Sequence, residues 1–329
     1  MNLLVISHNP DRASFRQRIE VYLDILRDNG IHCEPALLPP GCLARRKLFM
    51  SARNFDAVFL HKKKLSPVDA FWLRRYCRKL IYNFDDAVMF DEDNPARNSW
   101  SRLLSFRRTV KMADMIVVGS SYLAQYARKF NGRVEILPLG LKVGDYDVAP
   151  PPKTDDKVRL VWIGSQSTLK YLEAIKPVIE AVGAKFKNVV LRIIADKFFD
   201  MPNMTVEKLL WSEQTRNLGL VTSDIGLAPL PDDRFTQGKC SFKVLEYSAA
   251  ALPVVASPVG TNKDNIRQGV TGFLAENSDK WLEKITILVK DPQLRKTMGE
   301  QGRLFAQQFD VSVIGKRLCE IISSCVLQS

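Results

Sequence analysis

A short Pro-rich segment divides this chain into two halves, and each half repeats the same alternation of apolar strand patterns and helical patterns. The segment covers residues 149–157 (APPPKTDDK), and its composition is typical of a linker. Alternating strands and helices build parallel sheets that are covered on both faces. A length of 329 residues also favours about two domains. The sequence therefore predicts two α/β domains in tandem.

The periodicity of the apolar residues locates the elements of each half. Strands are expected at residues 3–7, 57–60, 80–82, 115–118, 158–163, 189–194 and 253–256. Helices are expected at residues 14–26, 67–78, 121–130, from about 170, and at 280–289, 292–308 and 311–326. These patterns predict a first domain at 1–148, the linker at 149–157, a second domain at 158–310 and a C-terminal helix at 311–329 that could cross back to the first domain.

The composition excludes several classes of protein. No run of 18 or more apolar residues is present, and the N-terminus lacks the basic lead and long apolar core of a signal peptide. The six cysteines show no metal-ligand spacing, and the three histidines are dispersed. We therefore expect a cytoplasmic protein with reduced thiols, without a metal site and without a bound cofactor.

The net charge of +12 is concentrated in the first half, where residues 1–150 carry 24 Lys and Arg against 16 Asp and Glu. Such a surface attracts anions, which could be nucleic acid, an acidic membrane face or phosphorylated substrates. The alternative is that dispersed basic residues only keep the protein soluble. No nucleic-acid motif or interleaved aromatic platform appears, so nucleic acid is not an expected partner.

Residues 224–260 carry the clearest functional pattern, which reads as strand, loop, helix, strand and loop. Ligands of parallel sheets bind beyond the carboxyl ends of the strands, where loops meet helix N-termini. Lys239 and Lys243 fall at such a junction, where cations oppose the helix dipole unless an anion such as a diphosphate is bound. Glu246 lies three residues after Lys243 on the same helix face, so a plain surface ion pair is the alternative.

Two further loops are expected at the same edges. Gly164 and Ser165 begin a loop that ends at Lys170 and could approach phosphate, although it is weaker than a P-loop and could be only a turn and a helix cap. In the first domain, loop or first-turn residues at the strand ends are candidates to bind a ligand, and the arginines among them suit an anion or could be only solvated surface charge. The candidates are His8, Arg16, Arg18, Asp85 and Asp86.

Several segments in order along the second half carry a family resemblance. They are WIGS at 162–165 with Lys170, SDIGLAPLP at 223–231, GKCSFKVLEY at 238–247, LPVVASPVG at 252–260 and GVTGFL at 269–274. Together they resemble the nucleotide-sugar-binding domain of family-4 retaining glycosyltransferases, or glycosyl transferases group 1. The resemblance implies the GT-B fold, in which two Rossmann-like domains face each other across a cleft.

The resemblance also implies roles for residues. A Glu at the position of Glu246 bonds the ribose of the donor, a Lys at the position of Lys170 holds the diphosphate, and the loop after strand 253–256 approaches the phosphates through backbone N–H groups. In this chain the loop residues are Ser257, Val259, Gly260 and Thr261. Trp211 could lie near the base by position, or could be an ordinary packed Trp.

Three positions depart from the family pattern. Gly238 stands where the family commonly has a second Glu that contacts the donor sugar, Ser165 replaces an Arg, and Ala251 replaces a Gly. Lys239 or Lys243 could supply the charge of the missing Arg, which makes Lys170, Lys239 and Lys243 the candidate catalytic residues.

The resemblance implies transfer of a sugar from a nucleoside-diphosphate sugar to a hydroxyl acceptor, with retention and without a metal. The basic first half fits a glycan or lipid-linked acceptor, which the candidate residues of the first domain would bind. It also fits polysaccharide or glycolipid synthesis and peripheral contact with an anionic inner membrane face. The alternative is a non-catalytic nucleotide- or anion-binding protein on the same fold.

Overall fold

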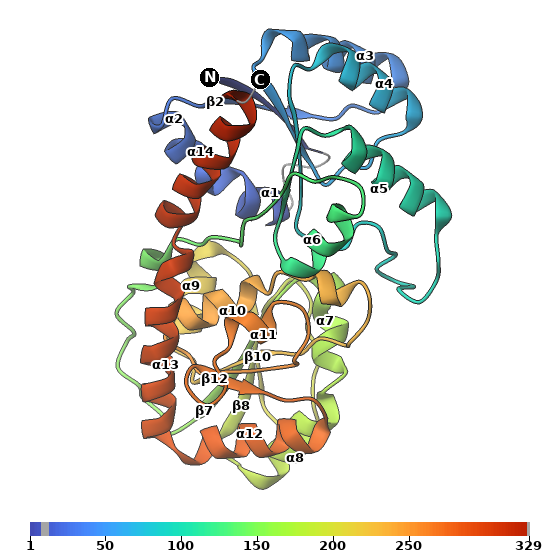
Figure 1. The fold of residues 1–329 in the computed structure, drawn as a ribbon. Coiled ribbons are helices and arrows are strands. Elements are labelled where there is room, and N and C mark those ends of the chain that lie inside the picture. The colour runs from blue at the N-terminus through green and yellow to red at the C-terminus, as the bar shows by residue number, and fades with distance from the viewer. Residues whose placement is uncertain (8–12, 328–329) are drawn as a thin grey trace. The chain divides into compact units, whose positions relative to one another are not determined.

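The computed structural model describes residues 1–7 and 13–327, which group into two compact units (Figure 1). The first unit consists of Met1–Leu141, Asp233–Cys240 and Phe309–Ser329, and the second of Lys142–Asp232 and Ser241–Gln308. Each unit contains one six-stranded sheet in which all the paired strands are parallel. Two Rossmann-like α/β units are therefore present, as the alternation of strands and helices predicted.

The sheet of the first unit has the strand order β2-β1-β3-β4-β5-β6. Its central strands β3 and β4 are buried at every position, as expected for strands covered on both faces. The strands are β1 (Asn2–Ser7), β2 (His32–Leu37), β3 (Ala57–His61), β4 (Leu80–Phe84), β5 (Met115–Val118) and β6 (Val134–Ile136).

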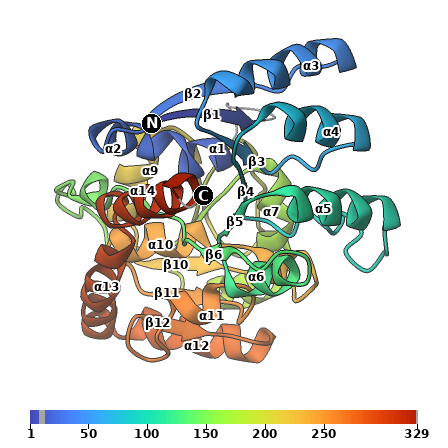
Figure 2. The same cartoon turned by 45° about the horizontal axis from the view of Figure 1, so that its top comes forward.

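Helices cover both faces of this sheet. The helices are α1 (Ala13–Arg18), α2 (Leu23–Asp28), α3 (Cys42–Ser51), α4 (Pro67–Tyr76), α5 (Trp100–Met112), α6 (Ser121–Arg128) and α14 (Val311–Leu327). Phe59 and Ile81 share a core cluster with Ile314 of α14, whereas Phe84 packs edge-on against Phe106 of α5. Successive strand residues face opposite sides, so α14 and α5 cover opposite faces. Figure 2 shows α3, α4 and α5 side by side.

The helix predicted at residues 14–26 is broken into α1, a 3₁₀ turn at Glu20–Tyr22, and α2. The break lies at Ile19, whose φ of −134° and ψ of −60° are not helical. Arg18 and Tyr22, on either side of it, bond to one distant segment: Arg18 Nη1 donates to Leu137 O, and Gly140 N donates to Tyr22 Oη at 2.8 Å. Tertiary hydrogen bonds therefore override the helical pattern.

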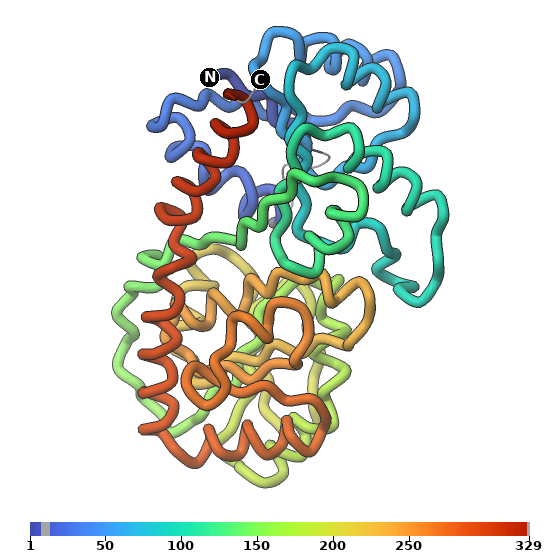
Figure 3. Tube along the Cα trace, in the orientation of Figure 1, coloured from blue at the N-terminus to red at the C-terminus, as the bar shows by residue number. Residues whose placement is uncertain are grey.

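The C-terminal helix α14 belongs to the first unit, so the chain does cross back, as the trace in Figure 3 shows. Val311 N donates to Leu141 O at 3.0 Å, and Leu141 N donates to Phe309 O at 3.0 Å. Ile314, Leu318 and Ile322 then enter the core of the first unit. No helix in the part of the chain that the structure describes is long and apolar enough to cross a membrane.

The sheet of the second unit has the strand order β12-β11-β10-β7-β8-β9. Its strands are β7 (Val158–Ile163), β8 (Val189–Ala195), β9 (Val206–Leu210), β10 (Ile225–Ala228), β11 (Val254–Ala256) and β12 (Gly272–Leu274). Its helices are α7 (Gln166–Glu173), α8 (Lys176–Lys185), α9 (Glu213–Val221), α10 (Phe242–Ala249), α11 (Asn262–Asn265), α12 (Ser278–Lys290) and α13 (Pro292–Ala306).

The division into units differs from the predicted boundaries at two places. Residues 142–157 group with the second unit, because the 3₁₀ helix Val143–Tyr146 packs on α9 and α10. Asp233–Cys240 groups with the first unit although β10 and α10, which flank it in sequence, do not. Arg234 explains this, since its carbonyl accepts from Tyr122 Oη at 3.0 Å and its Nη1 donates to Asn98 Oδ1 at 2.9 Å.

Candidate functional site

In the second unit, the loop after β7 is built around Gly164. A Cβ at this position would lie 2.4 Å from a ring carbon of Trp162 and 2.8 Å from Thr168 Oγ1, so the turn has room only for glycine. Ser165 follows as the N-cap of α7, and its N–H donates to Thr168 Oγ1 at 3.2 Å. The predicted turn and helix start are therefore present, and Lys170 lies exposed one turn into α7.

The N-terminus of α7 already carries an anionic partner. Gln166 N donates to Asp196 Oδ1 at 2.7 Å, and Asp196 comes directly after β8. The sequence analysis missed Asp196, although an Asp that ends a buried strand is a signal that could have found it. A phosphate at this helix end would compete with the Asp196 carboxylate for backbone N–H groups and the helix dipole.

Lys243 lies in the first turn of α10, as predicted. Its Nζ is 4.6 Å from the ring centroid of Trp162, so the ammonium rests on the face of a buried indole. Ser241 is the N-cap residue of this helix, but its side chain makes no capping hydrogen bond and its φ is +50°. In that left-handed conformation its buried hydroxyl is not directed at the first-turn N–H groups.

Glu246 is buried on the same helix, which argues against a simple surface pair with Lys243. Tyr146 Oη donates to Glu246 Oε1 at 3.2 Å, and Arg216 Nε lies 3.8 Å from the same oxygen. Burial raises the pKa of Glu246, while Arg216 and the Tyr146 hydrogen bond oppose the rise. Burial and the neighbouring Glu246 also raise the pKa of Tyr146, which keeps its hydroxyl a donor. The carboxylate is therefore held in one orientation before any ligand binds.

The loop after β11 folds tightly at the carboxyl edge of the sheet. Ser257 Oγ accepts from Leu230 N at 3.0 Å, Val259 N donates to Ser257 O at 2.8 Å, and Gly260 has a φ of +58°. Thr261, which follows, is buried and is the N-cap of the short helix α11. Trp211 follows β9 and is 40% exposed, so it is not an ordinary packed core Trp. All the predicted donor-binding residues thus belong to the second unit.

In the first unit, Asp85 and Asp86 follow β4 and form an ionic cluster with two lysines. Lys62 Nζ lies 2.8 Å from Asp85 Oδ1 and 2.5 Å from Asp86 Oδ2, and Lys239 Nζ lies 3.2 Å from Asp86 Oδ1. Lys239 is also 3.9 Å from Glu92 Oε1. Burial opposes ionisation of Asp86, but Lys62 and Lys239 prevail and hold its pKa below the usual range.

Lys239 therefore differs from its predicted place. It belongs to the first unit and pairs with acidic groups there, whereas Lys170 and Lys243 belong to the second. Lys62 was missed by the sequence analysis; it has a φ of +58°, which is uncommon for a residue with a side chain. It gave no local signal beyond its place after β3.

Packing within the first unit leaves room only for glycine at position 238. A Cβ there would lie 2.7 Å from Ala87 Cβ and 2.9 Å from Ala87 N, with Leu123 Cδ2 at 3.0 Å. The segment Asp233–Cys240 could not keep this position with a glutamate at 238. The departure from the family pattern is therefore linked to how this segment packs on the first unit.

A buried polar chain that the sequence analysis missed runs through His61. Asn83 Nδ2 donates to Val117 O at 3.1 Å, so Asn83 Oδ1 is the acceptor that faces His61 Nδ1 at 2.9 Å. His61 Nδ1 must then carry the proton, which leaves Nε2 to accept from Ser14 Oγ at 2.9 Å. Burial lowers the pKa of His61 to about 4, against the opposing charge of Asp85, so the ring is neutral.

The predicted anion-binding arginines of α1 are placed differently from expectation. Arg18 is buried, and its Nη1 donates to the carbonyls of Leu137 at 2.5 Å and Pro138 at 3.2 Å. The prediction that it is an exposed first-turn ligand is therefore wrong, because its guanidinium ties α1 to another segment. Arg16 is half-buried in the same helix, and His8 lies outside the described residues.

Comparison with known protein families finds a match for part of the chain. Residues 239–305 match the model of glycosyl transferases group 1. The match confirms the predicted family resemblance at the level of group 1 and includes α10 with Lys243 and Glu246. Across residues 1–7 and 13–327, no group of three or more His, Cys, Asp or Glu could hold a metal ion.

A curated relative and several solved structures are similar to the chain. An uncharacterized glycosyltransferase of Methanocaldococcus jannaschii is 36% identical over 85 residues, which span 22% of this chain and 24% of that protein. Sucrose-phosphate synthase from Thermosynechococcus elongatus has a TM-score of 0.79 at 14% identity, with both chains fully covered. HepE from Anabaena, solved with UDP and glucose, has a TM-score of 0.75 at 17% identity and covers 98% of this chain and 100% of its own. These structures confirm the GT-B fold.

Proposed function

We propose that this protein is a retaining glycosyltransferase that moves a sugar from a nucleoside-diphosphate sugar to a hydroxyl acceptor. The observation that carries the proposal is the buried Glu246, held by Tyr146 and Arg216 one turn after Lys243 in α10. Glu246 suits a ribose, because a carboxylate can accept hydrogen bonds from two adjacent hydroxyl groups. Lys243 suits a diphosphate, because its ammonium group attracts phosphate oxygens. The UDP–glucose complex of HepE, which shares the fold, supports a nucleotide sugar as donor.

The proposed chemistry depends on the departing diphosphate. The bond between the anomeric carbon and the phosphate oxygen breaks while the acceptor oxygen bonds to the same face of that carbon. The acceptor proton passes to the leaving phosphate, so no side chain has to act as a strong base. Lys243 and Lys170 would stabilise the negative charge that develops on the diphosphate, which is electrostatic catalysis without a metal.

The acceptor is assigned to the first unit. Asp85 and Asp86 follow β4 and both pair with Lys62, and Asp86 also pairs with Lys239. The two lysines hold the pKa of Asp86 below its usual range, so its carboxylate can accept hydrogen bonds from hydroxyl groups. The basic character of residues 1–150 supports a glycan or lipid-linked acceptor in polysaccharide or glycolipid synthesis. We place the reaction in the cytoplasm, with peripheral contact at the inner membrane face.

A panel of nucleoside-diphosphate sugars tests the proposal. Incubation with each donor and a set of lipid-linked and free glycan acceptors should release the nucleoside diphosphate from one donor class and yield a product with retained anomeric configuration. The Glu246→Ala variant is the negative control, and its activity should fall at least about tenfold because a charge-assisted hydrogen-bond acceptor is lost.

A non-catalytic nucleotide- or anion-binding protein is the second candidate. Gly238, which lacks the sugar-contacting Glu of the family, favours it, and so does the pairing of Lys239 with Asp86 in the first unit. Tight nucleotide binding without release of diphosphate across the whole panel would establish this alternative.

A further inference from the structure

The first unit exposes large apolar side chains at one edge of its sheet. Leu43 in α3 is 80% exposed, Phe71 in α4 is 62% exposed and Trp100 in α5 is 74% exposed. Leu37, Val68 and Leu104 complete this group, which we call the apolar rim. Soluble proteins seldom gather exposed aromatic and aliphatic side chains in this way without a binding role.

The topology explains why these residues lie together. Leu37 ends β2, and the other five members fall within the first five residues of α3, α4 or α5. The helices of a parallel α/β unit run antiparallel to the strands, so their first turns lie at the carboxyl edge of the sheet. The three helices are neighbours, as Figure 2 shows, and Arg45 Nε pairs with Asp69 Oδ1 at 2.9 Å between α3 and α4.

The segment that carries most of the rim is rich in basic residues. Residues 41–111, which contain α3, α4 and α5, carry 16 Lys and Arg against seven Asp and Glu. On α5, Trp100 and Leu104 continue into Arg107 and Lys111, which are exposed at helical spacing along the same stripe. A stripe of Trp and Leu followed by Arg and Lys is the composition of helices that lie in a lipid–water interface.

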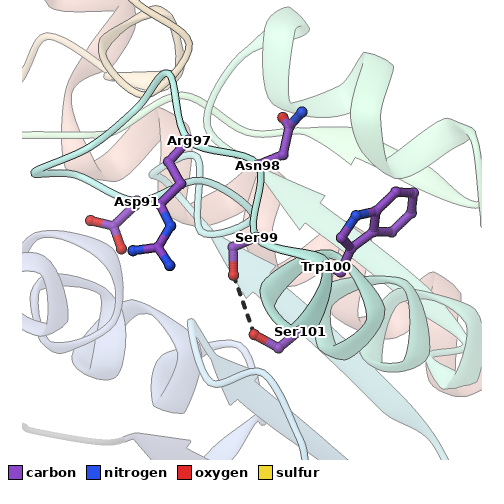
Figure 4. Close-up of a pocket in the computed structure, with 6 residues that line it drawn as sticks. All are labelled: Asp91, Arg97, Asn98, Ser99, Trp100 and Ser101. Atoms are coloured by element: carbon purple, nitrogen blue, oxygen red, sulfur yellow. Dashed lines mark hydrogen bonds between the residues drawn. The ribbon is translucent and has the colours of Figure 1, made fainter.

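A polar pocket adjoins the rim at Trp100. It has a volume of about 360 Å³ and is lined by Asp91, Arg97, Asn98, Ser99, Trp100 and Ser101. Figure 4 shows Trp100 at one side of this pocket and Arg97 at the other, with a hydrogen bond between Ser99 and Ser101. An apolar ring beside a pocket of polar groups suits the boundary between a lipid headgroup and its acyl chains.

We propose that the apolar rim and the basic residues of α3, α4 and α5 dock the first unit on an anionic lipid bilayer. Trp100, Phe71 and Leu104 enter the interface, and Arg107 and Lys111 contact the anionic headgroups. Charge complementarity selects the bilayer as the occupant. Docking of this surface would bring the protein to a lipid-linked acceptor, and in this respect the inference rests on the proposed function.

Vesicle flotation with the full chain tests the docking without donor or acceptor. The protein should float with vesicles of phosphatidylcholine and phosphatidylglycerol at low salt, remain behind with phosphatidylcholine alone, and detach as salt screens the headgroups. Arg107→Ala with Lys111→Ala should weaken binding about 30-fold, since each basic residue near an anionic surface contributes about 1 kcal/mol. Trp100→Ala with Leu104→Ala should weaken it at least about tenfold by removing apolar contact.

Matched controls come from α14, on the opposite face of the same sheet. Lys316→Ala with Arg317→Ala removes two exposed charges there and should change binding by no more than about twofold. In the wild type, the fluorescence emission should shift to the blue on anionic vesicles, and Trp100→Phe should abolish most of that shift. All these positions are exposed, so the variants should keep the thermal midpoint of the wild type.

Three results would overturn the docking proposal. One is no flotation with anionic vesicles at low salt, and another is an equal loss in the α5 and α14 double variants. The third is a concentration-dependent dimer that Trp100→Ala with Leu104→Ala disrupts while vesicle binding is absent, because a second copy would then cover the rim. Failure of the docking proposal can be told apart from failure of the proposed function, since nucleoside diphosphate binding is measured without vesicles.

Discussion

Lys239 Nζ lies 3.2 Å from Oδ1 of Asp86, within the first unit, and Lys62 Nζ lies 2.5 Å from the other carboxylate oxygen of Asp86. One carboxylate is therefore shared by two ammonium groups that are far apart in the sequence. The charge of Lys239 is therefore balanced by Asp86, and no bound diphosphate is needed to explain its position. Lys243, on the face of Trp162, is then the lysine of this pair that we propose to contact the donor diphosphate.

The two lysines should therefore respond differently to substitution. Lys243→Ala should weaken binding of a nucleoside diphosphate about tenfold, because a hydrogen bond to a charged group contributes roughly 1.5–3 kcal/mol. Lys239→Ala should leave that affinity within about twofold and instead lower the free energy of unfolding by about 1 kcal/mol. Calorimetric titration and urea unfolding of both variants measure the two effects. Equal losses of nucleotide affinity would show that Lys239 also serves the donor.

The contrast between these lysines shows what sequence could and could not predict. Both lie in the loop–helix segment that follows β10, only four residues apart, so local pattern placed both at the start of α10. The alternation of apolar runs was sufficient to predict the two parallel sheets, because β3, β4, β7 and β8 are predominantly apolar, as strands buried on both faces require. The docking of Asp233–Cys240 depends on Arg234 and residues more than a hundred positions away, and no local pattern reports such contacts.

The same limit applies within the sites. Arg18 has the spacing of an exposed first-turn residue, but the carbonyls of Leu137 and Pro138 draw it into the interior. Glu246 was predicted from its family position, whereas its partner Tyr146 lies one hundred residues earlier in a segment predicted to end the first domain. Trp211 could be placed only as near the base or packed, and the structure leaves its side chain 40% exposed.

The buried chain through His61 predicts how stability depends on pH. The pKa of His61 is lowered to about 4 in the folded state, so the unfolded state binds its proton first as the pH falls below about 6.5. The stability contributed by the neutral ring is complete above that value and is lost between about pH 6.5 and 4. Between pH 7.5 and 5 the loss should be about 2 kcal/mol.

The His61→Gln variant isolates this contribution, because it keeps a polar side chain but removes the titrating ring. Urea unfolding at both pH values should show a smaller loss for His61→Gln than for the wild type, with other titrating groups common to both. An equal loss in the two proteins would mean that His61 does not hold its proton as the geometry requires.

Gly238 should not tolerate even one added carbon. Gly238→Ala should lower the free energy of unfolding by about 1–3 kcal/mol, because its Cβ meets Ala87 at 2.7 Å. Gly132→Ala is the matched control, since a Cβ there meets nothing within 4 Å, and its effect should stay within about 0.5 kcal/mol. Thermal or urea unfolding compares the two. If Gly238→Ala were as stable as Gly132→Ala, the packing explanation for the missing Glu would fail.

Substitution of Asp196, unlike that of Lys243, should strengthen the binding of a nucleoside diphosphate. Asp196→Ala removes the carboxylate that bonds Gln166 N at the start of α7, so a diphosphate should bind a few-fold more tightly. The same change should cost about 1 kcal/mol of stability, because the helix end loses its acceptor. Asp200→Ala, an exposed carboxylate in the same connection, is the control. Weaker nucleotide binding by Asp196→Ala would place the diphosphate away from α7.

The role of Glu246 is tested by calorimetric titration of nucleoside diphosphates into the wild type and the Glu246→Ala variant. The wild type should bind at least one nucleoside diphosphate, and Glu246→Ala should weaken that binding at least about tenfold. The matching 2′,3′-dideoxynucleoside diphosphate should bind both proteins about equally weakly. Absence of binding by the wild type, or unchanged affinity in Glu246→Ala, would contradict the assignment of Glu246 to the donor ribose.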